Sequence, residues 1–175
     1  MHAWRWPEDS ALRLIERSKS RDDSEAKALA CYGLLLEDQH VLHRRARQML
    51  LRFVDGRPLS SVTIAFLEWA CSEMATQGKR VCVLVWDNAS WHVSHEVRDW
   101  IGQHNRRVKR DGGCRLLVCC LPTKSPWLNP IEPTWLHGKR AIAEANGSLT
   151  IADVIDRVCK YYGCAELPLI QKKTG

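Results

Sequence analysis

Two acidic residues stand just beyond apolar runs in this sequence, where the strands of a sheet are expected to end. Asp87 directly follows the run 80–86, and Glu132 follows the run 114–121 after a polar loop. Ligands of open α/β sheets gather at the carboxyl ends of the strands, and hard cations prefer carboxylate oxygens. If the two strands are neighbours, the two acids meet at one edge and can hold a metal ion.

Each acid also has a simpler explanation. Asp87 and Asn88 can cap a helix that begins after the strand, which is a common use of these residue types. Glu132 falls in the first turn of an expected helix, where a negative charge offsets the helix dipole. For Asp87 alone, capping is the better interpretation. The second acid, at the end of the next strand, is what favours a shared site.

The elements that must position these acids alternate between strands and helices. Apolar runs predict buried strands over 28–36, 48–56, 80–87 and 114–121. Helical spacing predicts an amphipathic helix over 60–79, opened by Ser60 or Ser61, and a helix with a basic end over 92–110. The order strand, strand, helix, strand, helix, strand predicts an α/β domain.

Two further helices are expected after the polar loop. One covers 129–145, with Pro130 and Pro133 in its first turn, and the other covers 151–162 with Thr150 as its cap. The chain is therefore divided into a polar lead-in arm, a domain and a tail, at 1–27, 28–163 and 164–175.

Composition limits the kind of protein. The 175 residues are enough for one domain, and 45% hydrophobic residues can fill its core. No apolar run approaches about 18 residues and the amino terminus lacks the apolar centre of a signal peptide, so we expect a cytoplasmic protein. A net charge of +6 favours a polyanionic partner.

Eight cysteines raise the question of disulfides or zinc. Cys82, Cys119 and Cys120 lie in apolar, strand-like runs, so we expect reduced thiols in the core. The residues His137, Cys159 and Cys164 do not have the spacing of a recognised zinc site, and a structural metal is not expected.

Four stretches of the sequence resemble one known family. They are KALACYGLL (27–35), FVDGRPLS (53–60), DNASWH (87–92) and LPTKSPWLNPIEPTWLHGK (121–139). In this order they resemble the DDE catalytic domain of bacterial insertion-sequence transposases related to the mariner superfamily. The resemblance covers most of 28–163, and it implies an RNase H-like mixed sheet flanked by helices.

The resemblance also implies cut-and-join chemistry on DNA, with transposon ends and target DNA as partners. Three carboxylates of the family hold two Mg²⁺ ions, for which Mn²⁺ can substitute. One ion activates the attacking oxygen and the other stabilises the leaving oxygen. By matching positions, Asp87 is the second of these acids and Glu132 is the third.

Other residues of the same motifs are candidates for supporting roles. Asn88 and His92 can orient a ligand, a water or the backbone near the metal ions; alternatively, Asn88 caps a helix and His92 faces solvent. Asn129 and Ser125 are expected to fix the loop that aims Glu132.

Basic and aromatic residues complete the set of candidates. Those that can follow DNA phosphates are Arg106, Arg107, Lys109, Arg110, Lys124, Lys139 and Arg140. A solvated helix face is the usual meaning of a run such as 106–110, and His43-Arg44-Arg45 has the same two interpretations. Trp135 is expected to pack in the core, while the role of Trp127 stays open.

The chain departs from the family before position 28. The first acid of the family belongs on a strand upstream of ALACYG, and residues 1–27 contain no apolar strand that ends in Asp. Asp22 and Asp23 lie in a polar stretch that predicts a loop. The amino-terminal helix-turn-helix region of such transposases is absent as well. We therefore expect a truncated form that lacks the first strand of the sheet and the first acid.

Three classes of function remain. The chain is an active DDE recombinase fragment, a catalytically inactive remnant that binds DNA without sequence preference, or an unrelated basic module, which fits the motifs badly. The absent acid separates the first two, because two carboxylates bind one Mg²⁺ weakly and the two-ion site needs a third. The expected partners besides DNA are a second copy of the chain in a homo-oligomer, or a separately encoded upstream segment that can supply the missing acid.

Overall fold

The structure is a computed structural model that describes residues 29–38, 46–142 and 150–170. Its elements in chain order are β1 (Leu29–Asp38), β2 (Ala46–Asp55), α1 (Ser60–Thr76), β3 (Val81–Trp86), α2 (His95–Asp111), β4 (Arg115–Cys120), a 3₁₀ turn (Pro126–Leu128), α3 (Ile131–Ile142) and α4 (Ile151–Tyr162). Every strand and helix expected from the sequence is present, in the expected order. The lead-in arm, with Asp22 and Asp23, and the stretch His43-Arg44-Arg45 lie outside the described residues.

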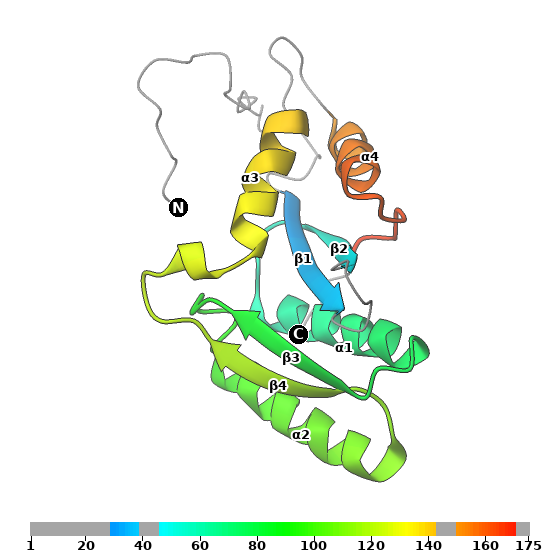
Figure 1. The fold of residues 1–175 in the computed structure, drawn as a ribbon, viewed down its shortest axis with the longest axis vertical. Helices are drawn as coiled ribbons and strands as arrows, with labels where there is room; N and C mark the ends of the chain where they lie inside the picture. The colour runs from blue at the N-terminus through cyan, green and yellow to red at the C-terminus, as the bar shows by residue number, and fades with distance from the viewer. Residues whose placement is uncertain (1–28, 39–45, 143–149, 171–175) are drawn as a thin grey trace, which may run out of the picture.

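The strands form two small sheets (Figure 1). β1 and β2 are antiparallel, with Leu29 opposite Asp55, whereas β3 and β4 are parallel, with Val81 opposite Arg115. A parallel pair needs a crossover connection, and α2 supplies it. The expected mixed α/β class is confirmed, and in the described residues the strands are divided into two pairs, with β1 and β3 not hydrogen-bonded to each other.

Helix α1 fixes the two sheets relative to each other. Its buried residues recur three and four positions apart and so form one face: Val62, Thr63, Phe66, Leu67, Ala70, Cys71 and Met74. Phe66 packs in a cluster with Tyr32 of β1 and Val54 of β2. Leu67 packs in another cluster with Leu84 and Trp86 of β3.

The start of α1 differs from the prediction of a serine cap. The residue before the helix is Leu59, and no side chain caps the helix there. The Tyr32 hydroxyl instead accepts the Leu59 N–H at 3.3 Å, while the Thr63 hydroxyl donates to the Leu59 carbonyl at 3.1 Å. A tyrosine from β1 thus satisfies the N–H of the residue before the helix, and no local pattern indicates such a distant partner.

One face of the β3–β4 pair is covered. Residues Cys82, Leu84 and Trp86 pack in the cluster that α1 and α2 share, while Val81, Val83 and Val85 between them are exposed. In β4, Leu116 is buried and Leu117 is exposed. The prediction of buried strands therefore holds for one face only in the described residues, because α1 and α2 cover one face of the pair.

All eight cysteines are free thiols, as expected. Cys82 lies in the core, but Cys119 and Cys120 at the end of β4 are exposed, so their predicted place in the core is wrong. The alternation of β4 turns Cys119 toward the uncovered face of the pair, and Cys120 is the last residue of the strand.

Helix α4 and the segment after it lie beside β2. Thr150 caps α4 as predicted, in a reciprocal pair of hydrogen bonds with Asp153. Residues 164–170, expected to be part of a tail, reach β2, where the Ile170 N–H donates to the Phe53 carbonyl at 2.8 Å. No helix in the described ranges is long and apolar enough to cross a membrane.

Candidate active site

Asp87 is the first residue after β3, and its side chain is 53% exposed. Its Oδ1 atom accepts the Ala89 N–H at 3.0 Å and lies 2.7 Å from Nδ1 of His92. An ionised carboxylate can only accept, so His92 donates through Nδ1. No donor of the described residues reaches Oδ2. One oxygen of Asp87 is therefore held in place, and the other is available to a ligand.

His92 is itself held by aromatic rings. Its imidazole stacks on the indole of Trp86, with ring centroids 4.9 Å apart and planes within 4° of each other. Trp91 meets the imidazole edge-on at 5.9 Å. The interpretation of His92 as a solvent-facing residue is wrong, because the ring is packed and bonded to Asp87.

Asn88 joins the ends of β3 and β4. Its Nδ2 atom donates to the Leu121 carbonyl at 2.6 Å, and the Leu121 N–H donates to the Trp86 carbonyl at 2.9 Å. The cap of α2 is Ser94, whose hydroxyl accepts the Val97 N–H at 3.3 Å. Helix capping by Asp87 or Asn88 is therefore wrong, because a turn separates both residues from α2.

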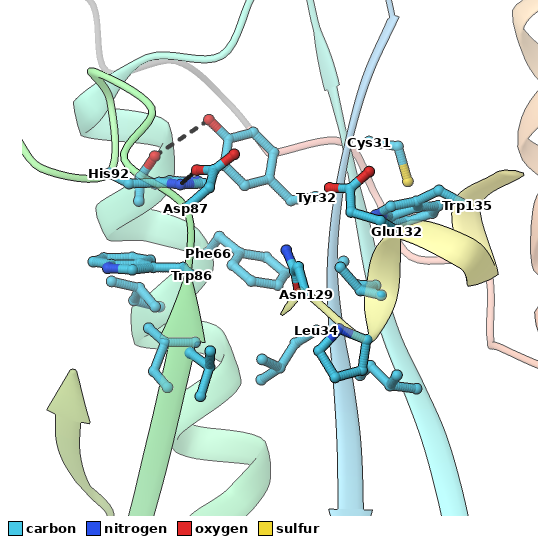
Figure 2. A pocket seen from close by; sticks show the side chains of 18 of the residues that line it. Cys31, Tyr32, Leu34, Phe66, Trp86, Asp87, His92, Asn129, Glu132 and Trp135 are labelled. Carbon is cyan, nitrogen blue, oxygen red and sulfur yellow. Dashed lines mark hydrogen bonds and ion pairs between the residues drawn. The ribbon is translucent and has the colours of Figure 1, made fainter. Parts of the chain in front are cut away.

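Glu132 lies in the first turn of α3, as predicted. The loop before it is held by backbone hydrogen bonds, from the Leu128 N–H to the Ser125 carbonyl and from the Glu132 N–H to the Asn129 carbonyl, both 3.1 Å long. The main chains of Ser125 and Asn129 thus fix this loop, and the Ser125 hydroxyl adds a long hydrogen bond of 3.5 Å to the Thr123 carbonyl. The Asn129 side chain lines the pocket (Figure 2).

Trp135 anchors α3 on β1. Its ring lies over Gly33, where the Cβ of any other residue would be 2.5 Å from Cη2 of the indole. The ring also meets Tyr162 of α4 at 5.6 Å and 80°. Trp135 packs as expected, but it is half-buried at the edge of the molecule's core rather than in it. Glu132, one helical turn earlier, takes its position from β1. Trp127 is 73% exposed.

Asp87 and Glu132 line one pocket of about 640 Å³, whose walls come from β1, α1, β3 and the start of α3. Figure 2 shows the two carboxylates on opposite sides of this pocket, Asp87 beside β3 and Glu132 on α3. Glu132 is exposed, and partial loss of hydration at the rim of the pocket raises its pKa; the negative charge of Asp87 raises this pKa further, and Lys139 lowers it. The two acids are therefore close enough to repel each other.

The oxygens of this pair fit a hard divalent cation, which would relieve their repulsion. Within the described ranges, no group of three or more His, Cys, Asp or Glu side chains is placed to hold a metal ion. The two carboxylates of Asp87 and Glu132 thus supply part of the ligands that a metal site needs.

The basic candidates do not gather at this pocket. Arg106, Arg107, Lys109 and Arg110 line a shallow groove on the carboxyl-terminal half of α2. Because α2 runs back from the end of β3 to the start of β4, this groove lies at the opposite end of the sheet from Asp87 (Figure 1). Of the basic candidates, Lys139 lowers the pKa of Glu132. Lys124 is exposed on the loop before α3, and Arg140 is exposed at the end of α3.

Sequence reasoning missed Trp86 and Gly33 as supports of the acids. A glycine inside an apolar strand is a known signal of close approach by another group, and Gly33 has this role for Trp135. For Trp86, the available signal is an aromatic residue directly before the acid with a histidine in the following turn.

Comparison with known proteins agrees with this geometry. A family model described as "DDE superfamily endonuclease" matches residues 41–154. The chain belongs to the DDE superfamily of endonucleases. No curated protein matches it in sequence.

One solved structure resembles this DDE endonuclease chain, with a TM-score of 0.50 and 12% sequence identity. It is described as "Mos1 transposase paired-end complex with left transposon end", and the match covers 79% of this chain and 47% of that one. At this identity the match supports the fold, and the expected RNase H-like class is confirmed. The chain matches about half the length of that transposase.

Proposed function

We propose that this chain is the catalytic domain of a transposase and that Asp87 and Glu132 are ligands of the divalent metal ions used for DNA strand cleavage and transfer. The observation that carries the proposal is the pair of carboxylates from separate elements in one pocket, in which the negative charge of Asp87 raises the pKa of Glu132. Lys139 offsets only part of the repulsion between the two acids, whereas a metal ion would turn the same arrangement into a ligand set.

In this proposal each residue has a defined task. Asp87 and Glu132 hold the cation, and bound Mg²⁺ or Mn²⁺ supplies charge neutralisation at the phosphodiester oxygens. His92, fixed by Trp86, keeps Oδ1 of Asp87 occupied so that Oδ2 faces the ligand. Asn88 keeps the ends of β3 and β4 together and so fixes the turn that carries Asp87.

A second candidate is a transposase remnant without catalytic activity that binds DNA without sequence preference. It is favoured by the donor set of the described residues, which offers two carboxylates where the chemistry needs three. We expect residues 1–175 alone to be inactive and an upstream segment bearing the first acid to restore activity. A separately encoded segment is the proposed source of that acid, because a second copy of the chain in a homo-oligomer lacks the same acid, and the proposed compartment is the bacterial cytoplasm.

The test is nicking of supercoiled plasmid in the presence of Mg²⁺ or Mn²⁺. The proteins compared are the 175-residue chain and the chain extended upstream, each as wild type and with Asp87→Ala or Asp99→Asn. Asp99 is an exposed acid on α2 and serves as the matched control. We expect nicking by the extended chain and its Asp99→Asn variant only. Nicking by the 175-residue chain that Asp87→Ala abolishes would show that an acid within residues 1–175 completes the site.

Binding of the metal alone is a separate test. Mn²⁺ titrated into the 175-residue chain should bind weakly, and Asp87→Asn or Glu132→Gln should remove this binding while Asp99→Asn keeps it. Equal Mn²⁺ binding by all four proteins would contradict the assignment of Asp87 and Glu132.

A further inference from the structure

Trp127 differs from the other tryptophans in the part of the chain that the structure describes. Each of the others contacts another aromatic ring: Trp69, Trp86, Trp91, Trp100 and Trp135. Trp127 has no ring contact and no hydrogen bond among the described residues, and it is 73% exposed, more than any other large hydrophobic residue there. Its indole is therefore free to bind a partner.

Trp127 lies on the turn that leads to Glu132. The 3₁₀ turn Pro126–Leu128 follows β4, and Glu132 is in the first turn of α3. The neighbouring Leu128 is 49% exposed and lines the pocket that contains Asp87 and Glu132. Successive residues of a 3₁₀ helix are about 120° apart around its axis, so the indole lies beside the mouth of the pocket rather than inside it. Figure 1 shows this turn at the outer edge of the molecule, between the end of β4 and the start of α3.

The turn holds Trp127 in place. The Leu128 N–H donates to the Ser125 carbonyl at 3.1 Å, which closes the turn around Trp127. Lys124, just before the turn, has a φ of 60°, in the left-handed region that is unfavourable for residues with a side chain. Backbone strain of this kind is concentrated at binding and catalytic sites. An indole on a fixed turn also loses little conformational entropy when it binds a partner.

The charges around Trp127 favour a polyanion as its partner. Lys124 is exposed three positions earlier in the same loop. Lys139 is exposed on α3, roughly 10 Å along the helix from Glu132, and its charge lowers the pKa of that acid. Trp127 and Leu128 are the exposed large hydrophobic residues of the loop, and they form a smaller apolar patch than a protein partner usually covers. A nucleic acid strand, with its phosphates and aromatic bases, fits both features.

We propose that Trp127 stacks on an unpaired base of single-stranded DNA, while Lys124 neutralises a phosphate next to that base. Every base presents an aromatic face, so the contact does not depend on sequence. Both faces of a base inside a duplex are already stacked, so the partner is a base that is unpaired, flipped out or at a strand end. Because Glu132 follows Trp127 closely, the stacked base belongs to the strand whose phosphodiester lies at Asp87 and Glu132; this last part rests on the proposed function.

The experiment measures binding of a fluorescein-labelled oligothymidine of about twelve nucleotides by anisotropy, without divalent metal. The proteins are the 175-residue chain and its Trp127→Ala, Trp127→Phe and Tyr161→Ala variants. Tyr161 is an exposed aromatic residue on α4 and serves as the matched control. Trp127→Ala should weaken binding by roughly fivefold or more, because it removes the stacking surface. Trp127→Phe keeps a ring and should bind nearly as the wild type and Tyr161→Ala do. Equal binding by the wild type and Trp127→Ala, or no binding by either, overturns the proposal.

Two further DNA ligands separate base stacking from attraction to phosphates. An oligonucleotide of the same length with abasic sites in place of its bases keeps its phosphates. A relaxed closed-circular plasmid, used as an unlabelled competitor, keeps its bases paired. The wild type and Trp127→Ala should bind each of these ligands equally well. A loss on Trp127→Ala as large as that seen with oligothymidine would show a contact that needs no unpaired base, which overturns the proposal.

Fluorescence of the indole gives a direct measurement of stacking. A base stacked on Trp127 should quench its emission. Oligothymidine should therefore lower the tryptophan fluorescence of the wild type more than that of Trp127→Phe when both proteins are saturated. Equal quenching of the two proteins overturns the proposal.

The binding and quenching measurements need no metal ion and no cleavage, so they test the stacking independently of the proposed function. In the nicking assay, Trp127→Ala in the chain extended upstream should slow nicking, and Tyr161→Ala should not. Binding that depends on Trp127, together with no nicking by the extended chain, would support the stacking and reject strand cleavage. Binding that depends on Trp127, together with nicking that Trp127→Ala leaves unchanged, would overturn the assignment of the base to the cleaved strand. A dimer in sedimentation that Trp127→Ala dissociates, with no binding of single-stranded DNA, would make the indole a contact between copies and overturn the proposal.

Discussion

Replacing Gly33 by alanine should destabilise the protein and displace Glu132. The new Cβ would lie 2.5 Å from Cη2 of Trp135 and 3.0 Å from Cδ2 of Leu51, whereas carbon atoms normally pack about 3.5–4.0 Å apart. The indole must therefore move by about 1 Å or more. Overpacking of this kind costs roughly 2 kcal/mol, which corresponds to a fall in Tm of about 4–8 °C for a chain of this size.

The measurement is urea unfolding followed by far-UV circular dichroism, together with the Mn²⁺ titration of the site. Gly102→Ala is the matched control, since a Cβ at Gly102 in α2 meets nothing within 4 Å. This control should raise stability by about 0.5–1 kcal/mol, because alanine favours the helix. An equal gain in stability from Gly33→Ala, with unchanged Mn²⁺ binding, would refute the idea that Trp135 and β1 position Glu132.

Three further predictions concern other parts of the molecule. Thr150→Ala removes the reciprocal cap of α4 and should lower the free energy of unfolding by about 1 kcal/mol, measured with urea; an unchanged value would contradict the role of the cap. Glu132 has a raised pKa in the folded state, so its contribution to stability is present below the usual glutamate pKa of about 4.3 and is lost as pH rises through the folded value. Glu132→Gln should therefore become more stable relative to wild type from pH 4 to pH 7, and a difference independent of pH in thermal scans would exclude this coupling. DNA binding, measured by anisotropy, should be weak, indifferent to sequence and steeply reduced by salt; replacing Arg106 and Arg110 by Gln should lower the salt slope by about one for each phosphate that the protein no longer neutralises, and an unchanged slope would place the DNA elsewhere.

Secondary structure was predictable because each element has a local signal. The apolar run of β3 and the cap at Thr150 need only neighbouring residues to be recognised. Burial was less predictable, since it depends on what packs against each face. Val83 and Cys119 are apolar residues in apolar runs, and they are exposed because α1 and α2 cover only the other face.

Asp87 and Glu132 were predictable because the family motifs and the expected strand ends indicate the same two residues. The residues that hold these acids in place were not predictable. His92 could be assigned to solvent or to the site from the sequence, and the stack on Trp86 decides between them. The hydroxyl of Tyr32 at the start of α1 and the ring of Trp135 over Gly33 join residues far apart in the chain. Contacts of this kind depend on tertiary packing, so no periodicity or local spacing predicts them.

Each of the two acids in the pocket is attached to a different strand. Asp87 is fixed to the β3–β4 pair through Asn88 and the Leu121 backbone, while Glu132 is fixed to β1 through Trp135. The separation of the two carboxylates therefore follows the separation of β1 and β3. Helix α1 packs against β1 through Phe66 and against β3 through Leu67, so this helix sets the separation and with it the metal affinity that we expect of the two acids.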